Sequence, residues 1–117
     1  MTTEEYRQLT KSKTRSKYHA QPVFVDGYRF DSKREAARWK QLTYMQMAGV
    51  ITALRRQVQF ILIDKSEHGR AIRYIADFVY IQDGHEVVED AKGVQTDVYR
   101  LKKRLMAERY GITIQEV

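Results

Sequence analysis

The order of apolar and polar positions predicts several short strands and two helices. Residues 23–30 form two apolar-rich runs around Asp26-Gly27, a dipeptide typical of a type I′ hairpin turn. Residues 30–51 carry apolar side chains at helical spacing. The other predicted elements are strands at 58–64, 72–81 and 86–92, a helix at 97–111 and a last strand at 112–117. This order predicts an α/β fold with a mixed central β-sheet flanked by helices.

A second tight turn, at Asp83-Gly84, fixes the register of the hairpin formed by residues 72–92. Counting outward from that turn places Asp77 directly opposite Asp90. Opposed residues have Cβ atoms about 4.5–5.5 Å apart, and like charges there are destabilising. Lys92 follows two residues after Asp90 and is therefore expected on the same face.

Two facing carboxylates between apolar strands need something that neutralises their charge. A shared proton, an ion pair with Lys92 and a divalent cation would each do so. Carboxylate oxygens suit Mg²⁺, which proteins hold through one or two carboxylates plus waters and substrate phosphates. Glu89 faces the opposite side and is left out of the pair. The residues favour a metal site over a structural ion-pair cluster.

Composition narrows the function classes. The 117 residues suffice for one domain, and the absence of cysteine excludes disulfides, thiolate catalysis and thiolate zinc sites. No run approaches the roughly 18 apolar residues of a membrane helix, so no membrane partner is expected. The formal net charge of +6 points to a polyanionic partner, with nucleic acid first.

Basic residues gather in two places. The segment 1–21 is predicted to be a flexible arm that either contacts phosphates or is a solvated tail, and 22–117 is the expected domain. The second helix provides further cations beside the paired acids. The candidate DNA-binding residues are Lys11, Lys13, Arg15, Lys17, Arg100, Lys102 and Lys103.

Asp77, followed after a hairpin by Asp90-Ala91-Lys92, resembles the signature of the PD-(D/E)xK nuclease superfamily, which has a restriction-endonuclease-like fold. Ala76 stands where that signature has its proline, a position that varies across the superfamily. The stretches "GYRFDSKREAARW", "RYIADFVY", "VVEDAKG" and "YRLKKRL" look like a small phage-associated family of uncharacterised proteins assigned to this superfamily. The resemblance covers residues 22–117.

The resemblance implies a catalytic site made of Asp77, Asp90, Lys92 and Glu35. The acids would hold Mg²⁺, with Mn²⁺ able to substitute, and Lys92 would orient water or stabilise charge on the phosphate. Glu35 also stands three residues after Ser32, the spacing of a helix capping box. It is therefore either a metal ligand or a cap; Ser32 or Asp31 would begin the helix.

The expected activity is Mg²⁺-dependent hydrolysis of DNA phosphodiesters by an endonuclease. Small members of the superfamily include dimeric Holliday-junction resolvases, so branched DNA and a homodimer are expected by analogy, in the cytoplasm of a bacterial host or encoded by a phage. The alternatives are a non-catalytic DNA-binding protein that retains the nuclease fold, and a structural phage protein whose acids form only ion pairs.

Overall fold

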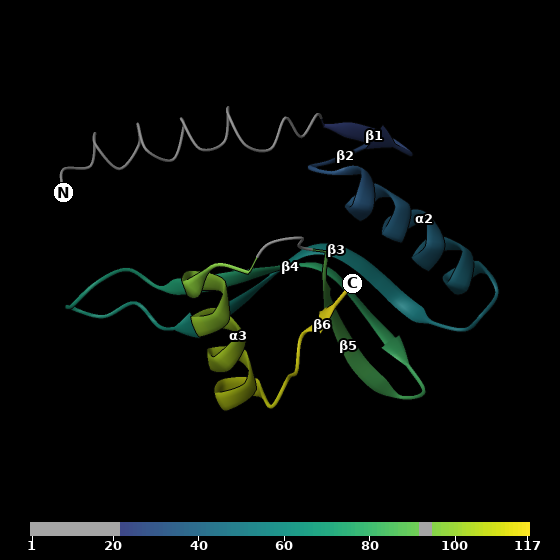
Figure 1. The fold of residues 1–117 in the computed structure, drawn as a ribbon. Coiled ribbons are helices and arrows are strands. Elements are labelled where there is room, and N and C mark those ends of the chain that lie inside the picture. The colour runs from purple at the N-terminus through teal and green to yellow at the C-terminus, as the bar shows by residue number, and fades with distance from the viewer. Residues whose placement is uncertain (1–21, 92–94) are drawn as a thin grey trace. The chain divides into compact units, whose positions relative to one another are not determined.

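In the computed structural model, residues 22–91 and 95–117 are described, and they contain both strands and helices (Figure 1). The chain divides into two units, one ending at Ala36 and one running Ala37–Val117. The elements are β1 (Val23–Val25), β2 (Tyr28–Phe30), α2 (Lys33–Met47), β3 (Thr52–Ile63), β4 (Ile72–Gln82), β5 (His85–Asp90), α3 (Asp97–Tyr110) and β6 (Gln115–Glu116). Neither of these helices is long and apolar enough to cross a membrane.

The first unit contains the predicted N-terminal hairpin. Strands β1 and β2 pair antiparallel, and the turn between them has positive φ at both Asp26 (52°) and Gly27 (80°). Two consecutive positive φ angles define the type I′ turn that the dipeptide predicted. The Ser32 side chain then caps α2, because its Oγ accepts a hydrogen bond from the Glu35 backbone at 3.1 Å.

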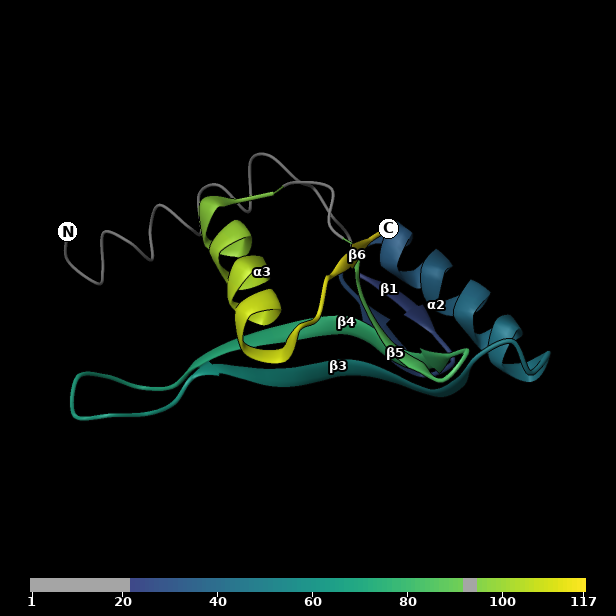
Figure 2. The same ribbon diagram turned by 90° about the horizontal axis from the view of Figure 1, so that it is seen from below.

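The second unit is built on a four-stranded sheet in the order β3-β4-β5-β6 (Figure 2). Strands β3, β4 and β5 pair antiparallel, whereas β6 pairs parallel to β5. The mixed sheet is therefore confirmed. The β4–β5 register runs without a break from Gln82↔His85 to Phe78↔Glu89, as the Asp83-Gly84 turn predicted.

Several predicted boundaries are wrong. Strand β3 begins at Thr52, six residues before the predicted start at residue 58. Residues 52–57, a segment of polar and apolar side chains, become extended because they pair with the second half of β4, although φ is positive at Ala53 and Gln57. Pairing with a neighbouring strand here outweighs low strand propensity. The last two strands are also shorter than predicted: β5 ends at Asp90 and β6 spans only two residues.

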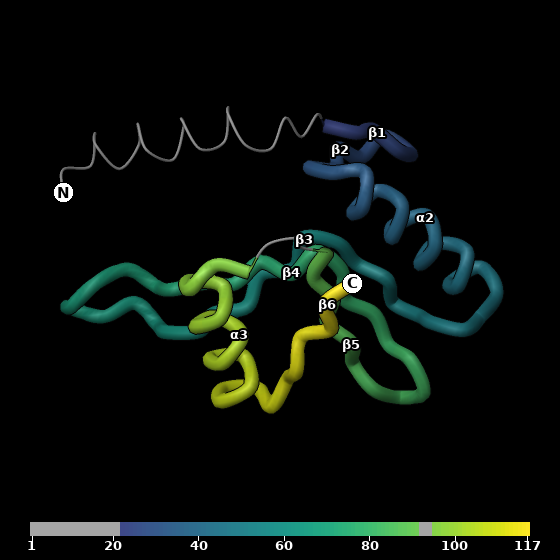
Figure 3. The backbone as a smooth tube through the Cα atoms, in the orientation of Figure 1, coloured from purple at the N-terminus to yellow at the C-terminus, as the bar shows by residue number. Residues whose placement is uncertain are grey.

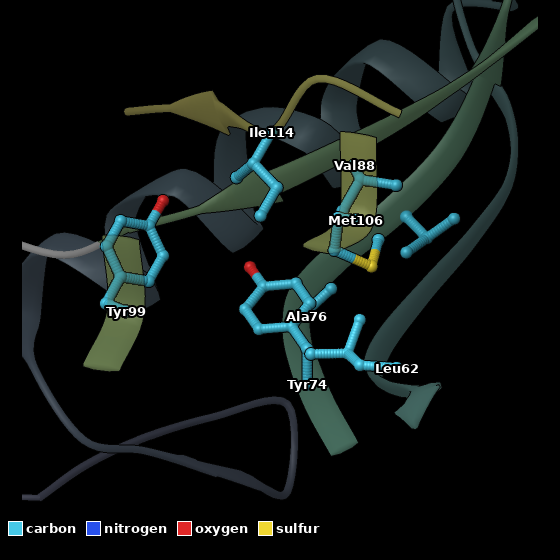
Figure 4. Packing of buried hydrophobic residues seen from close by; sticks show 8 residues of the cluster. Leu62, Tyr74, Ala76, Val88, Tyr99, Met106 and Ile114 are labelled. Atoms are coloured by element: carbon cyan, nitrogen blue, oxygen red, sulfur yellow. The ribbon is translucent and has the colours of Figure 1, made fainter. Parts of the chain in front are cut away.

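Helix α3 packs on one face of this sheet. It begins after a Thr96 cap and is ended by Gly111, whose φ is 67°, so the helix predicted at 97–111 is confirmed. Figure 4 shows the apolar cluster beneath it, to which strands β3, β4 and β5 contribute. Its buried members are Leu62, Tyr74, Ala76, Val79, Val88, Tyr99, Met106 and Ile114.

The part of α2 that belongs to the second unit is attached to the other face by a buried ion pair. Arg38 donates to both carboxylate oxygens of Glu89, at 2.7 and 2.6 Å, and the Tyr80 hydroxyl donates to the same carboxylate. Only 1% of the Glu89 side chain is exposed. Trp39 stacks on Phe78 nearby, with ring centroids 6.1 Å apart.

These hydrogen bonds also set the ionisation of their donors. Burial, followed by the hydrogen bond to Glu89, raises the pKa of Tyr80 to about 12. The same carboxylate raises the pKa of Arg38 above its usual value. Both groups therefore keep their protons at neutral pH and remain donors to Glu89.

Arg38→Ala is expected to reduce the free energy of unfolding by about 3–5 kcal/mol, because it leaves the buried Glu89 carboxylate without its cation. Urea denaturation followed by circular dichroism measures this loss. Arg100→Ala is the matched control, since its ion pair with Asp97 is exposed and is expected to contribute less than about 1 kcal/mol. Equal losses in the two variants would contradict a structural role for the Arg38–Glu89 pair.

Candidate functional site

Asp77 and Asp90 lie beside each other on β4 and β5, as the hairpin register predicted. The pair that follows Phe78↔Glu89 in this register is Asp77 with Asp90. Val79 and Val88, two residues nearer the turn, both belong to the cluster under α3. Because directly opposed residues of neighbouring strands point to the same face, the two carboxylates lie on one side of the sheet. The Ala91 backbone N–H, next to Asp90, donates to Oδ2 of Asp77 at 2.8 Å.

Asp90 is fully buried, and only one of its two carboxylate oxygens has a hydrogen-bond partner among the described residues. Its Oδ2 accepts a hydrogen bond of 2.6 Å from the Tyr74 hydroxyl. Its Oδ1 is buried and has no hydrogen-bond partner among residues 22–91 and 95–117. An unsatisfied buried acceptor costs about 1–3 kcal/mol, and more when the group is charged. Such an atom in a native fold calls for an explanation, and a bound ion is one.

Asp77 is held from two directions. Besides the Ala91 N–H on Oδ2, the Gln57 side-chain amide lies 3.5 Å from Oδ1. Gln57 sits on β3 with φ at 53°, one of the irregular positions of that strand. Asp77 is half-buried, so its carboxylate lies closer to solvent than that of Asp90. Donors that fix carboxylate oxygens in this way are typical of the residues around metal ligands.

Two buried tyrosines share this environment. Burial is the main cause that raises the pKa of Tyr74 above its usual value, followed by the hydrogen bond to Asp90. Burial and then the charge of Asp90 raise the pKa of Tyr99 as well. Asp77 acts in the same direction on both hydroxyls. The two carboxylates thus act on the ionisation of both phenols, and the tyrosines stay protonated.

Glu116 is a third acid near the pair that sequence reasoning missed. It pairs with Asp90 in the parallel register of β5 and β6, and its charge also raises the pKa of Tyr99. Its carboxylate is occupied by Lys103 and by the Gln95 amide. No short turn connects β5 to β6, so no sequence signal set this register.

The remaining predicted site residues fall into three groups. Glu35 belongs to the first unit, where its Oε2 accepts a hydrogen bond of 3.4 Å from the Asp31 N–H. Of the predicted DNA-binding cations of α3, Arg100 pairs with Asp97 and Lys103 with Glu116, whereas Lys102 has no acidic partner among the described residues. Outside the described residues lie Lys92, Lys11, Lys13, Arg15 and Lys17.

The donor atoms at Asp77 and Asp90 fit a hard divalent cation. They offer carboxylate oxygens only, and the buried Oδ1 of Asp90 has a lone pair that no described residue uses. Within residues 22–91 and 95–117, no three His, Cys, Asp or Glu side chains gather closely enough to form a ligand set. Mg²⁺ is commonly bound by only one or two carboxylates, with waters and substrate phosphates as the other ligands.

Comparison with known proteins gives a family but no characterised relative. Residues 15–115 match the family described as "Protein of unknown function (DUF1064)". The chain matches no curated protein and no solved structure. The matched segment includes β4, β5 and both carboxylates of the candidate site. Because it also spans well over half of the sequence, the chain belongs to the DUF1064 family.

Proposed function

We propose that this protein is a Mg²⁺-dependent DNA endonuclease of the PD-(D/E)xK superfamily. The observation that carries the proposal is the pair of carboxylates on adjacent strands, one of which keeps a buried oxygen without a described partner. Further support comes from the order of elements: a helix with an acid in its first turn, three antiparallel strands, a second helix and a parallel strand. This arrangement accords with a restriction-endonuclease-like fold.

Asp77 and Asp90 would hold the metal in this proposal. When bound, Mg²⁺ lowers the pKa of a coordinated water and neutralises charge on the scissile phosphate. Tyr74 and the Ala91 N–H each hold one oxygen of a carboxylate, which fixes the orientation of both ligands. Lys92, assigned by resemblance, would stabilise the charge that develops on the phosphate.

The substrate follows by analogy with the small members of the superfamily. A domain of this size leaves little room for a separate module that reads base sequence, so recognition of DNA shape is favoured. Branched DNA is therefore the proposed substrate, and a homodimer would bring two sites to two strands. The second candidate function, a non-catalytic DNA-binding protein, predicts DNA affinity without cleavage and needs no divalent cation.

Metal binding is the first test. MgCl₂ or MnCl₂ is expected to raise the melting temperature of the wild-type protein, since a ligand at 100 times its Kd stabilises by about 2.7 kcal/mol. Asp90→Asn should abolish this shift, because an amide replaces the carboxylate. Asp97→Asn is the control, an exposed acid on α3 whose loss should leave the shift intact. The same metal-induced shift in Asp90→Asn would rule out this metal site.

Cleavage is the second test. Linear, single-stranded, flap and four-way DNA are incubated with protein and Mg²⁺, and the products are separated on denaturing gels. Cleavage is expected, with preference for the branched substrates, and EDTA should abolish it. Asp77→Asn and Asp90→Asn should both be inactive while remaining folded by circular dichroism. Full activity in EDTA, or no cleavage of any substrate, would contradict the proposal.

The third test distinguishes a catalytic role of Glu35 from a role in capping the helix. If Glu35 contributes to the metal site, Glu35→Gln should reduce turnover at limiting Mg²⁺ by about 10–100-fold with little change in stability. Ser32→Ala is the matched control. It removes the cap oxygen that accepts from the Glu35 N–H and should cost about 1 kcal/mol of stability without reducing turnover. Wild-type cleavage by Glu35→Gln would leave Glu35 with the capping role alone.

A further inference from the structure

The ribbon of β3 and β4 extends past α3, as the tube in Figure 3 shows. Two hollows lie along the end of this ribbon that carries basic side chains. The first, of about 500 Å³, is lined by Lys65, Arg70, Ala71 and Arg73. The second, of about 250 Å³, is lined by Arg73 and Tyr74 of β4 together with Thr96, Tyr99 and Lys102 of the α3 segment. Because Arg73 lines both, the two hollows adjoin at this residue. Their four cations, Lys65, Arg70, Arg73 and Lys102, are here called the basic track.

The four cations of the basic track lie close together, and no described acid neutralises them. Within the described residues, none of the four forms an ion pair. By contrast, Arg38, Arg55, Arg100, Lys103 and Arg109 are each paired with a carboxylate. Lys65, Arg70 and Arg73 are exposed and Lys102 is partly so. The track therefore concentrates uncompensated positive charge, which attracts a polyanion.

The N-terminus of α3 adds to this field. Thr96, the cap of this 14-residue helix, lines the second hollow beside Lys102. The positive end of the helix dipole therefore lies at the same place as the two cations of that hollow. A side-chain cation on the helix, one on the strand and the helix terminus itself favour the same kind of ligand, a phosphate group.

The track leads to the candidate metal site. Tyr74 lines the second hollow, and its hydroxyl donates to Asp90. One side chain thus joins the end of the basic surface to the buried carboxylate. No Asp or Glu is among the described residues that line the two hollows. A phosphodiester chain that lies along the track would therefore reach the neighbourhood of Asp77 and Asp90 without passing a like charge in either lining.

We propose that the basic track binds the phosphate backbone of DNA and guides it to the Asp77–Asp90 pair. This inference rests on the proposed nuclease function, and it replaces the sequence-based surface of Arg100, Lys102 and Lys103 with one that keeps only Lys102. The occupant is a DNA strand rather than an acidic protein, because an unneutralised row of cations matches regularly spaced phosphates and ends at carboxylates suited to a metal.

The test compares variants of equal charge loss. DNA binding is measured by fluorescence anisotropy in EDTA, so that no cleavage occurs, over a series of salt concentrations. Arg73→Gln/Lys102→Gln should weaken binding and reduce the slope of log K against log salt by about 0.9 per lost phosphate contact. Lys40→Gln/Arg104→Gln also loses one lysine and one arginine, neither of which lines the hollows, and should keep the wild-type slope.

The outcomes separate this inference from the nuclease proposal. The basic track is overturned if the two double variants have equal slopes or if the protein binds no DNA. A third variant, Arg100→Gln/Lys103→Gln, removes the two other cations predicted from the sequence, and a slope that falls only in this variant would also overturn the track. A track-dependent slope without cleavage in Mg²⁺ would support the track and contradict the nuclease. DNA cleavage by the wild-type protein, together with an unchanged slope in Arg73→Gln/Lys102→Gln, would support the nuclease and contradict the track. Circular dichroism and melting temperatures verify that each variant is folded, and the single variants Arg73→Gln and Lys102→Gln serve if the double variant is not.

Discussion

Two consecutive carboxylates at the end of β5, Glu89 and Asp90, are buried on opposite faces of one strand. Burial of a charge is costly unless hydrogen bonds or an opposite charge compensate it. The fold around β5 supplies such groups from both sides. On the α2 face, Arg38 and Tyr80 surround Glu89, and on the α3 face, Tyr74 donates to Asp90. On each face of the sheet, the packing thus depends on the compensation of one buried carboxylate of β5.

Glu89 and Asp90 differ in how completely their buried carboxylates are compensated by hydrogen bonds and opposite charge. This difference distinguishes a structural carboxylate from one that can bind a ligand. Glu89 has both oxygens in hydrogen bonds and a cation within 2.6 Å. Asp90 has one hydrogen bond to a neutral phenol and a second oxygen without a described partner. A carboxylate that only stabilises the fold would be expected to resemble Glu89. The incomplete compensation of Asp90, with Asp77 beside it, supports a ligand at this position.

What the sequence could predict depended on local signals. The Asp26-Gly27 and Asp83-Gly84 turns fix hairpin register through their own backbone preference, so the Asp77–Asp90 juxtaposition followed from counting. The start of β3 could not be predicted, because residues 52–57 become extended only by pairing with β4. The Arg38–Glu89 pair joins residues 51 apart in sequence, which no helical or strand periodicity reveals. Sequence periodicity likewise does not reveal the ion pair between Lys103 and Glu116. This pair neutralises Lys103, which the sequence had predicted to contact DNA.

The energetic weight of Asp90 can be judged against the stability of a small domain. Native domains are stable by only about 5–15 kcal/mol, and one unsatisfied buried charged acceptor costs at least about 1–3 kcal/mol of that. Replacing Asp90 with an apolar residue would remove the cost, and the surrounding Val88 and Ala76 show that apolar side chains fit the adjacent positions. Proteins depart from such local rules chiefly at functional sites. The sheet therefore carries at Asp90 a destabilising group that a bound cation would turn into a stabilising one, and the unpaired cations of the basic track approach it from the side where Tyr74 holds it in place.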